Sequence, residues 1–384
     1  MNSIKLHGDK IFFGNDSTKA LRNLEGKRAF VVTGGTTIKK KGYLDEVIAQ
    51  LKAAGFSVKC FDSVEPDPSV ETVQAGAEQM IEFSPDYIVA IGGGSPIDAA
   101  KAMWIFYEHP DLDFANTLDL VDIPSLRNKA KFVAIPTTSG TASEVTKAMV
   151  IKDKKKKLKK GIRTEDAIPD LAILEPKFTA TMPAWLTAAT GMDAFTHALE
   201  AYVSVKANDF SDVLATGALE GIFKFLPLAF VKPDNLEYRE KVLNYQSIAG
   251  MAFSNVGLGI VHSMAHQLGG VFGVAHGLAN ALILPYVVQY NTKSEAAQQK
   301  YEHLAKRLGV SDLALAIKGL NKELEIPMAI KELDISKEEF ELELDLIVKR
   351  ALEDGCTLTN PRRINEKEMK ALFKYIYEGK KIDF

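Results

Sequence analysis

The sequence predicts two domains, an α/β domain with a doubly wound parallel sheet and then an all-α domain. In the first half, short apolar runs alternate with segments of helical periodicity, as strands and helices do in such a sheet. After Pro176, long segments keep a 3.6-residue period with no strand between them. Because Pro176 and Pro183 mark this change, we expect domains at about 1–180 and 181–384. A chain of 384 residues is long enough for two cores.

Each element of the first half follows from a local pattern. Strands are expected at the apolar runs 29–33, 57–61, 87–91 and 131–135. Helices are expected between them, over 43–54, 70–83 and 97–107. The short runs 149–151 and 171–174 predict a hairpin that completes the domain. In the second half, the helical patterns cover 185–203, 210–226 and 237–254.

Composition narrows the classes of function. The net charge is −3, so no basic field favours nucleic acid or an anionic membrane, and a small-molecule substrate is expected. Residues 1–10 lack the apolar core of a signal peptide, and no run of about 18 uncharged apolar residues follows, which predicts a cytoplasmic protein. Cys60 and Cys356, the only cysteines, are expected to be free structural thiols.

A glycine turn at 91–96 follows one predicted strand and begins a predicted helix. Gly93, Gly94 and Ser95 would offer backbone N–H groups at the helix N-terminus, a suitable place for a pyrophosphate. The alternative is a tight strand-to-helix turn without a ligand. A second cluster, 136–141, places hydroxyl groups at the end of another strand, where open α/β sheets bind ligands.

The lysine-rich run at 154–160 lies between two predicted strands. Its ordinary interpretation is a solvated hairpin tip. The functional alternative is that one lysine reaches the phosphates or ribose of a cofactor.

Histidines in the helical half carry the most specific signal. Asp193 and His197 are four residues apart, as are His262 and His266, so each pair shares one helix face. His276 follows after a turn that contains glycine. Imidazoles and a carboxylate suit Fe(II) or Zn(II), which would act as a Lewis acid on a carbonyl or an alkoxide. No nucleophile–histidine triad or carboxylate pair indicates a hydrolase.

With these motifs in place, the chain resembles the iron-containing (group III) alcohol dehydrogenase family almost from end to end. The matching segments are residues 92–101, 136–146, 191–194, 262–266 and 276–277. Within the family, residues 99–110 and 382–384 are most similar to butanol dehydrogenases of the clostridial type. The resemblance implies a Rossmann-like domain, a helical domain, a metal in the cleft between them, and a homo-oligomer built on a dimer.

The resemblance also assigns roles to residues. It implies metal ligation by Asp193, His197, His262 and His276, and places His266 beside the nicotinamide as a candidate for proton relay. The implied cofactor residues are Gly93, Gly94, Ser95, Asp98, Thr137, Thr138, Thr141 and Lys159. The segment around Lys159 departs from the family pattern, because Gly161 replaces the usual proline.

The end of the first predicted strand bears on the choice of cofactor. Members that prefer NAD carry an aspartate there, which accepts from the ribose 2′-hydroxyl and repels a 2′-phosphate. Here Gly34 stands at that place, Gly35 continues the turn as a further candidate cofactor residue, and Lys39, Lys40 and Lys41 follow. This predicts a preference for NADPH over NADH, and predicts that Gly34→Asp shifts the preference toward NADH.

The expected reaction is the reversible reduction of a short-chain aldehyde, such as butanal, to the primary alcohol. Phe253 and other apolar residues of 248–260 are expected to line an aliphatic pocket. One alternative is a diol or lactaldehyde oxidoreductase of the same family. Two others are a metal-dependent lyase of the dehydroquinate synthase type and a non-catalytic nucleotide sensor.

Overall fold

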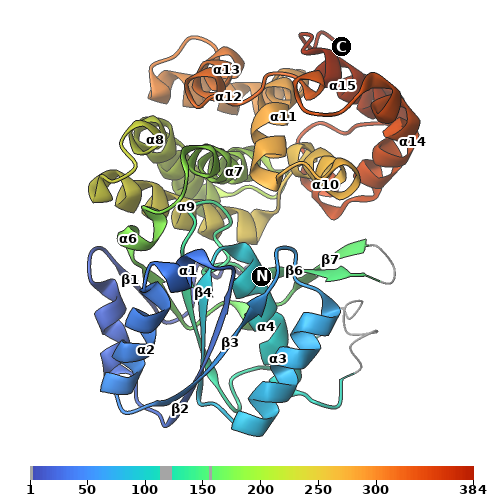
Figure 1. Ribbon diagram of the computed structural model, residues 1–384. Helices are drawn as coiled ribbons and strands as arrows, with labels where there is room; N and C mark the ends of the chain where they lie inside the picture. The colour runs from blue at the N-terminus through green and yellow to red at the C-terminus, as the bar shows by residue number, and fades with distance from the viewer. Residues whose placement is uncertain (1–2, 113–122, 155–157) are drawn as a thin grey trace. The chain divides into compact units, whose positions relative to one another are not determined.

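The computed structural model describes residues 3–112, 123–154 and 158–384. Contacts between Cα atoms divide the chain into two compact units, Met1–Thr181 and Met182–Phe384, each with its own hydrophobic core. The first unit is built on a parallel sheet and the second is helical (Figure 1). The predicted fold class is therefore confirmed.

The sheet of the first unit has six parallel strands in the order β1-β8-β5-β4-β2-β3. The strands are β1 (Lys10–Phe13), β2 (Arg28–Gly34), β3 (Ser57–Val64), β4 (Tyr87–Gly92), β5 (Lys131–Pro136) and β8 (Leu171–Leu174). The central strand β4 is buried along its whole length, which explains its continuous apolar sequence.

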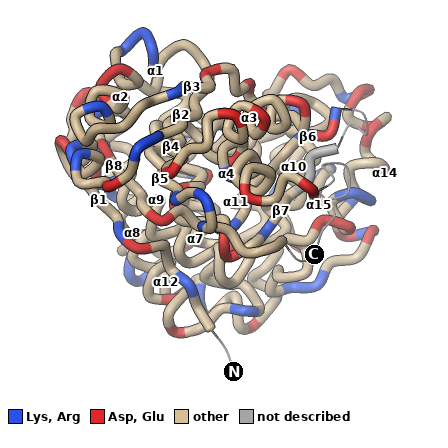
Figure 2. The backbone as a smooth tube through the Cα atoms, turned by 90° about the horizontal axis from the view of Figure 1, so that it is seen from below, with Lys and Arg blue, Asp and Glu red and all other residues tan. Residues whose placement is uncertain are grey.

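Helices cover both faces of this sheet. Side chains that alternate along β2 and β4 pack on one face against α3 (Val70–Phe83) and α4 (Gly94–Glu108). On the other face they pack against α2 (Tyr43–Ala53), as Figure 1 shows. The shorter helices of the unit are η1 (Ser17–Asn23), α1 (Thr37–Lys40), η2 (Glu165–Ala167) and α6 (Pro176–Thr179). In Figure 2, acidic and basic residues are interspersed around the unit, in keeping with the small net charge.

The predicted hairpin is wrong in its second strand. β6 (Ala148–Asp153) pairs antiparallel with β7 (Leu158–Arg163), whereas β8 joins the parallel sheet between β1 and β5. The lysine-rich sequence of β7 hid it, because a strand in a two-stranded ribbon needs few apolar side chains. The hairpin tip, residues 155–157, lies outside the described residues.

The second unit consists of helices around one core. They are α7 (Ala184–Val203), α8 (Asp209–Val231), α9 (Leu236–Val256), α10 (Ile260–Phe272), α11 (His276–Asn291), α12 (Glu295–Leu308), α13 (Leu313–Glu323), η3 (Ile330–Glu332), α14 (Lys337–Glu353), η4 (Gly355–Thr359) and α15 (Glu366–Glu378). Among the described residues, α8 is long and apolar enough to cross a membrane, and the α9–α10 pair passes the same test with a bend of 103°. Helices in a protein core can also pass this test. The packing of α8 against α7 and α9 accounts for its apolar sequence.

Candidate metal centre

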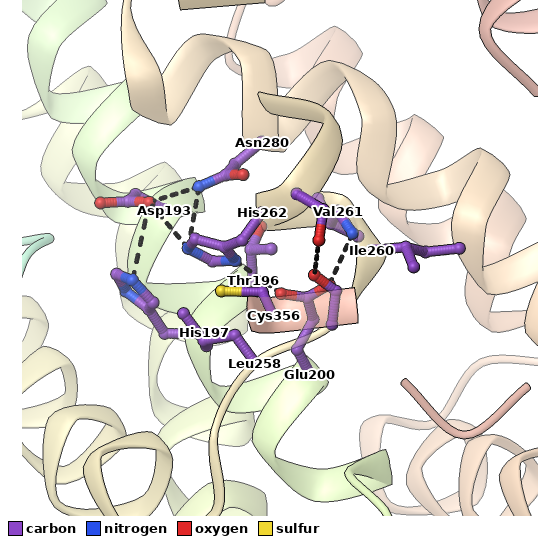
Figure 3. A network of polar contacts seen from close by, with 12 residues as sticks. Asp193, Thr196, His197, Glu200, Leu258, Ile260, Val261, His262, Asn280 and Cys356 are labelled. Carbon is purple, nitrogen blue, oxygen red and sulfur yellow. Dashed lines mark hydrogen bonds and ion pairs between the residues drawn. The ribbon is translucent and has the colours of Figure 1, made fainter. Parts of the chain in front are cut away.

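Three helices of the second unit bring the four predicted ligands together. Asp193 and His197 lie one turn apart on α7, His262 lies on α10, and His276 begins α11. From Asp193 Oδ1, the Nε2 atoms of His197, His262 and His276 lie at 4.0, 3.9 and 3.6 Å. Ligand atoms bonded at about 2.1 Å to one tetrahedral ion lie about 3.4 Å apart. Asp193, His262 and His276 offer ligand atoms within 4.8 Å of one another, and His197 approaches this group through Asp193 Oδ1. Figure 3 shows Asp193, His197 and His262 pointing toward one another.

Close approach of α11 to α7 depends on Gly277. A Cβ atom at this position would lie 2.3 Å from the carbonyl oxygen of Ala189 on α7. Only a residue without a side chain allows the first turn of α11 to reach α7, and this contact places His276 beside Asp193.

Replacing Gly277 by alanine is therefore expected to push α11 away from α7. We expect a loss of about 1–3 kcal/mol in the free energy of unfolding, together with weaker metal binding. Urea unfolding and metal analysis measure the two effects. Gly217→Ala on α8 is the matched control, because no described atom lies within 4 Å of its added Cβ. If both variants bound metal as tightly as the unaltered protein, this account of Gly277 would be wrong.

The donor set itself fits a cation. The side-chain nitrogen of Asn280 lies 2.7 Å from Asp193 Oδ1, 3.1 Å from His262 Nε2 and 3.2 Å from His276 Nε2. An amide nitrogen carries two hydrogens, so it cannot satisfy three acceptors at once. The Oδ1 atom of Asn280 is buried and has no hydrogen-bond partner among the described residues. Converging lone pairs that outnumber the available protons are what a divalent ion requires, and the four residues therefore suit the metal that the sequence predicts.

Glu200 fixes the orientation of His262. Its Oε2 atom lies 2.5 Å from His262 Nδ1, and its Oε1 atom accepts from the backbone N–H of Val261 at 2.7 Å. Burial raises the pKa of Glu200 to about 8 and lowers the pKa of His262 well below its usual value. Glu200 and His262 therefore share one proton, which lies between Oε2 of Glu200 and Nδ1 of His262. A cation on Nε2 would leave that proton on Nδ1, donated to the carboxylate, as in the carboxylate–histidine–metal arrangements of many proteins.

His266 is not among the four predicted ligands, and its ring contacts a different carboxylate, that of Asp354. Its Nδ1 atom lies 2.7 Å from Asp354 Oδ2, and its ring stacks on that of His276 with centroids 5.4 Å apart. Burial alone would raise the pKa of Asp354, but hydrogen bonds from His266 and from the backbone of Cys356 lower it below the usual value. The carboxylate of Asp354 is therefore charged beside the His266 ring.

Phe253, expected in the substrate pocket, lies directly beside the ligands. Its ring stacks on that of His197 with centroids 4.2 Å apart and an interplanar angle of 15°. An apolar ring in this position covers one face of the His197 imidazole.

The two predicted cofactor segments lie side by side in the first unit. Gly92 pairs with Pro136 across β4 and β5, and Thr137 donates its backbone N–H to the Gly92 carbonyl at 2.9 Å. A Cβ on Gly93 would lie 3.2 Å from Thr138 Oγ1, and one on Gly94 would lie 3.0 Å from Thr141 Cγ2. The glycine turn and the hydroxyl cluster therefore form one surface at the ends of the strands, where open α/β sheets bind nucleotides.

Other predicted cofactor residues have defined surroundings. Ser95 Oγ accepts from the backbone N–H of Asp67 at 3.2 Å. Asp98 Oδ2 accepts from the backbone N–H of Val150 at 2.9 Å, and burial raises the pKa of Asp98 to about 6 although Lys101 is nearby. The backbone of Lys159 lies opposite Lys152 in the hairpin, and its side chain lies outside the described residues.

Gly34 and Gly35 differ in the space around them. A Cβ on Gly34 would lie 2.1 Å from the carbonyl oxygen of Val64 in β3, so any side chain there must displace a strand. The expectation for Gly34→Asp therefore needs correction, because the variant would disturb the sheet as well as add a charge. Gly35 has no described atom within 4 Å of an added Cβ, so an aspartate there would clash with nothing, although φ +68 strains the backbone of any residue with a side chain.

Comparison with known proteins follows the same division of the chain. The pattern of the iron-containing alcohol dehydrogenases matches residues 8–176, and that of the Fe-containing alcohol dehydrogenase family, C-terminal, matches residues 187–377. The chain belongs to the iron-containing alcohol dehydrogenase family and is an oxidoreductase of alcohols and aldehydes, as the sequence motifs predict.

Particular relatives match over nearly their whole length. An NADPH-dependent butanol dehydrogenase of Clostridium saccharobutylicum is 48% identical over 97% of this chain and 98% of that protein. The structure of an iron-containing alcohol dehydrogenase from Thermococcus thioreducens superposes with a TM-score of 0.92 at 33% identity, over 98% of this chain and 100% of that chain. The structure of a 1,3-propanediol oxidoreductase superposes with a TM-score of 0.90 at 35% identity, over 98% of this chain and 100% of that chain.

Proposed function

We propose that this enzyme interconverts short-chain aliphatic aldehydes, of the butanal type, and primary alcohols, with NADPH as the preferred hydride donor. The observation that carries the proposal is that three imidazole nitrogens lie within 4.0 Å of the Asp193 carboxylate oxygen, beside the apolar ring of Phe253. The relative of 48% identity, an NADPH-dependent butanol dehydrogenase, supports both the substrate class and the cofactor.

Asp193, His197, His262 and His276 would hold the divalent ion, Fe(II) or Zn(II). When bound, such an ion supplies Lewis-acid polarisation of a carbonyl group. The side chains around it would orient the aldehyde, and Phe253 would contact its aliphatic chain. His266 would deliver the proton to the oxygen as hydride reaches the carbonyl carbon, so that aldehyde, NADPH and a proton give alcohol and NADP⁺.

Cofactor preference provides one test. We expect kcat/KM with NADPH to exceed that with NADH by about tenfold or more, because hydrogen bonds to a charged phosphate contribute about 1.5–3 kcal/mol. Gly35→Asp should lower the ratio of kcat/KM with NADPH to kcat/KM with NADH, since its carboxylate repels a 2′-phosphate. Steady-state kinetics with both cofactors measures the change.

The matched control is Gly55→Asp, which adds the same charge at another open position with positive φ, beyond the C-terminal end of α2. It should leave the ratio unchanged. A preference for NADH in the unaltered enzyme would contradict the cofactor assignment.

A diol oxidoreductase is the second candidate, supported by the likeness to the 1,3-propanediol oxidoreductase structure. A panel of butanal, propanal, lactaldehyde and 3-hydroxypropanal distinguishes the two. Highest kcat/KM for the unsubstituted aldehydes supports the proposal, and highest values for the hydroxyaldehydes support the alternative.

We also propose that the enzyme works in the cytoplasm as a homo-oligomer built on a dimer. Family resemblance supports the assembly, and light scattering on the purified protein tests it. A monomer at micromolar concentration would contradict the proposed assembly.

A further inference from the structure

The pair formed by His266 and Asp354 has a fixed direction of hydrogen bonding. An ionised carboxylate only accepts, so the proton between His266 Nδ1 and Asp354 Oδ2, at 2.7 Å, must be carried by Nδ1. The other ring nitrogen, Nε2, then has a free lone pair whenever the ring is neutral.

Asp354 is held more firmly than the acidic partner in an ordinary surface ion pair. Its other oxygen, Oδ1, accepts from the backbone N–H of Cys356 at 2.9 Å and so caps η4. Its side chain is only 18% exposed, whereas that of His266 is 40% exposed. Two hydrogen bonds to different groups fix the plane of this carboxylate, so it can impose an orientation on the imidazole.

The segment that carries Asp354 is also fastened to the helix that carries His266. Thr357 Oγ1 and Ser263 Oγ lie 2.7 Å apart, which joins η4 to α10 one turn before His266. On its other side, the His266 ring stacks on His276 with an interplanar angle of 14°. The carboxylate and this stacking together leave the ring little freedom to rotate.

We propose that Asp354 is a positioning residue that keeps His266 in the Nδ1–H tautomer, so that Nε2 is the nitrogen that exchanges a proton with the substrate. This inference rests on the proposed function. In alcohol oxidation, the hydroxyl proton passes to Nε2 while hydride leaves the same carbon for NADP⁺. In aldehyde reduction, the Nε2 proton passes to the oxygen while hydride from NADPH reaches the carbonyl carbon. Asp354 remains a carboxylate in both directions and stabilises the imidazolium.

Asp354→Asn tests the direction of this hydrogen bond. Its amide oxygen keeps the cap on Cys356, but its NH₂ group faces His266 Nδ1 and donates to it, which moves the ring proton to Nε2. We expect kcat for butanal reduction with NADPH to fall by about 10²- to 10⁴-fold, the range typical of general acid–base catalysis. KM for butanal should change by less than about twofold, because binding contacts remain.

Two further variants separate this role from a structural one. Asp354→Ser keeps a capping oxygen and offers His266 no partner, so its kcat should lie between those of Asp354→Asn and the unaltered enzyme. Glu353→Gln makes the same carboxylate-to-amide change at the neighbouring exposed residue and should leave kcat for butanal reduction unchanged. Metal content and thermal midpoint should be unchanged in all three.

A second readout does not depend on turnover. Diethylpyrocarbonate reacts with an unprotonated imidazole nitrogen, and mass spectrometry locates the product. His266 should react in the unaltered holoenzyme through Nε2, and its reaction should be lost in Asp354→Asn, where the remaining lone pair on Nδ1 is covered by the amide.

Equal kcat and equal labelling in Asp354→Asn and the unaltered enzyme would overturn the inference, as would equal kcat losses in the Asn and Ser variants. Failure of the unaltered enzyme to reduce any aldehyde would instead overturn the proposed function.

Discussion

His262→Ala is expected to abolish metal binding and to lower kcat/KM for butanal by about 10³-fold or more. His262 is buried between Asp193, Asn280 and Glu200, so its loss removes one donor and leaves the Glu200 carboxylate without a partner ring. Polarisation of a carbonyl by a metal contributes several kcal/mol, and each 1.36 kcal/mol corresponds to a factor of about ten in rate. Elemental analysis of protein purified without air, together with NADPH oxidation kinetics, measures both effects.

The matched control is His303→Ala, because His303 is exposed on α12. This variant should keep the metal and the activity of the unaltered enzyme. If His262→Ala retained full metal content and full activity, the ligand assignment would be wrong.

The sequence predicts that the proposed ligands lie close together because their spacing is a local property. Asp193 and His197 share a face of α7 through the helical period alone, and the glycine-containing turn before His276 has Gly273 at φ 71, which ends α10 and lets α11 begin. The turn at Gly93 and Gly94 is predictable for the same reason, since a strand, a glycine turn and a helix follow directly in the chain.

Three residues that contact the predicted site, or His266 beside it, were missed, although two of them carried a weak signal. Glu200 lies three residues after His197 on α7, and Asn280 lies four after His276 on α11, so helical spacing could have placed both on the ligand faces. Asp354 gave no such signal, because 88 residues separate it from His266 and only the packing of α14 and η4 on α10 joins them. The partner of β6 was mistaken for another reason, because the lysine-rich sequence of β7 lacks the apolar pattern of a buried strand.

Two histidines one turn apart on α10 thus each have a carboxylate on Nδ1. Glu200 lies on α7 and contacts His262, whereas Asp354 precedes η4 and contacts His266. In both pairs the carboxylate determines which ring nitrogen carries the proton. Under our proposals, His262 offers Nε2 to the metal and His266 offers Nε2 to the substrate. The same carboxylate-to-amide change should therefore weaken metal binding at Glu200 but lower kcat without loss of metal at Asp354.

Glu200→Gln is expected to weaken metal binding by about 10- to 100-fold, the usual cost of losing a carboxylate behind a ligating histidine. The amide oxygen can still accept from the Val261 N–H, while the NH₂ group donates to His262 Nδ1 and drives the ring proton onto Nε2, where the metal must bind. Titration of metal-free protein with Zn(II) against a competing chelator measures the affinity.

Glu108→Gln, which alters another buried carboxylate bound to backbone N–H groups, should lower stability without changing metal affinity. Unchanged affinity in Glu200→Gln would show that His262 keeps its tautomer without Glu200, whereas loss of metal in Glu200→Gln but not in Asp354→Asn would separate the two pairs by function.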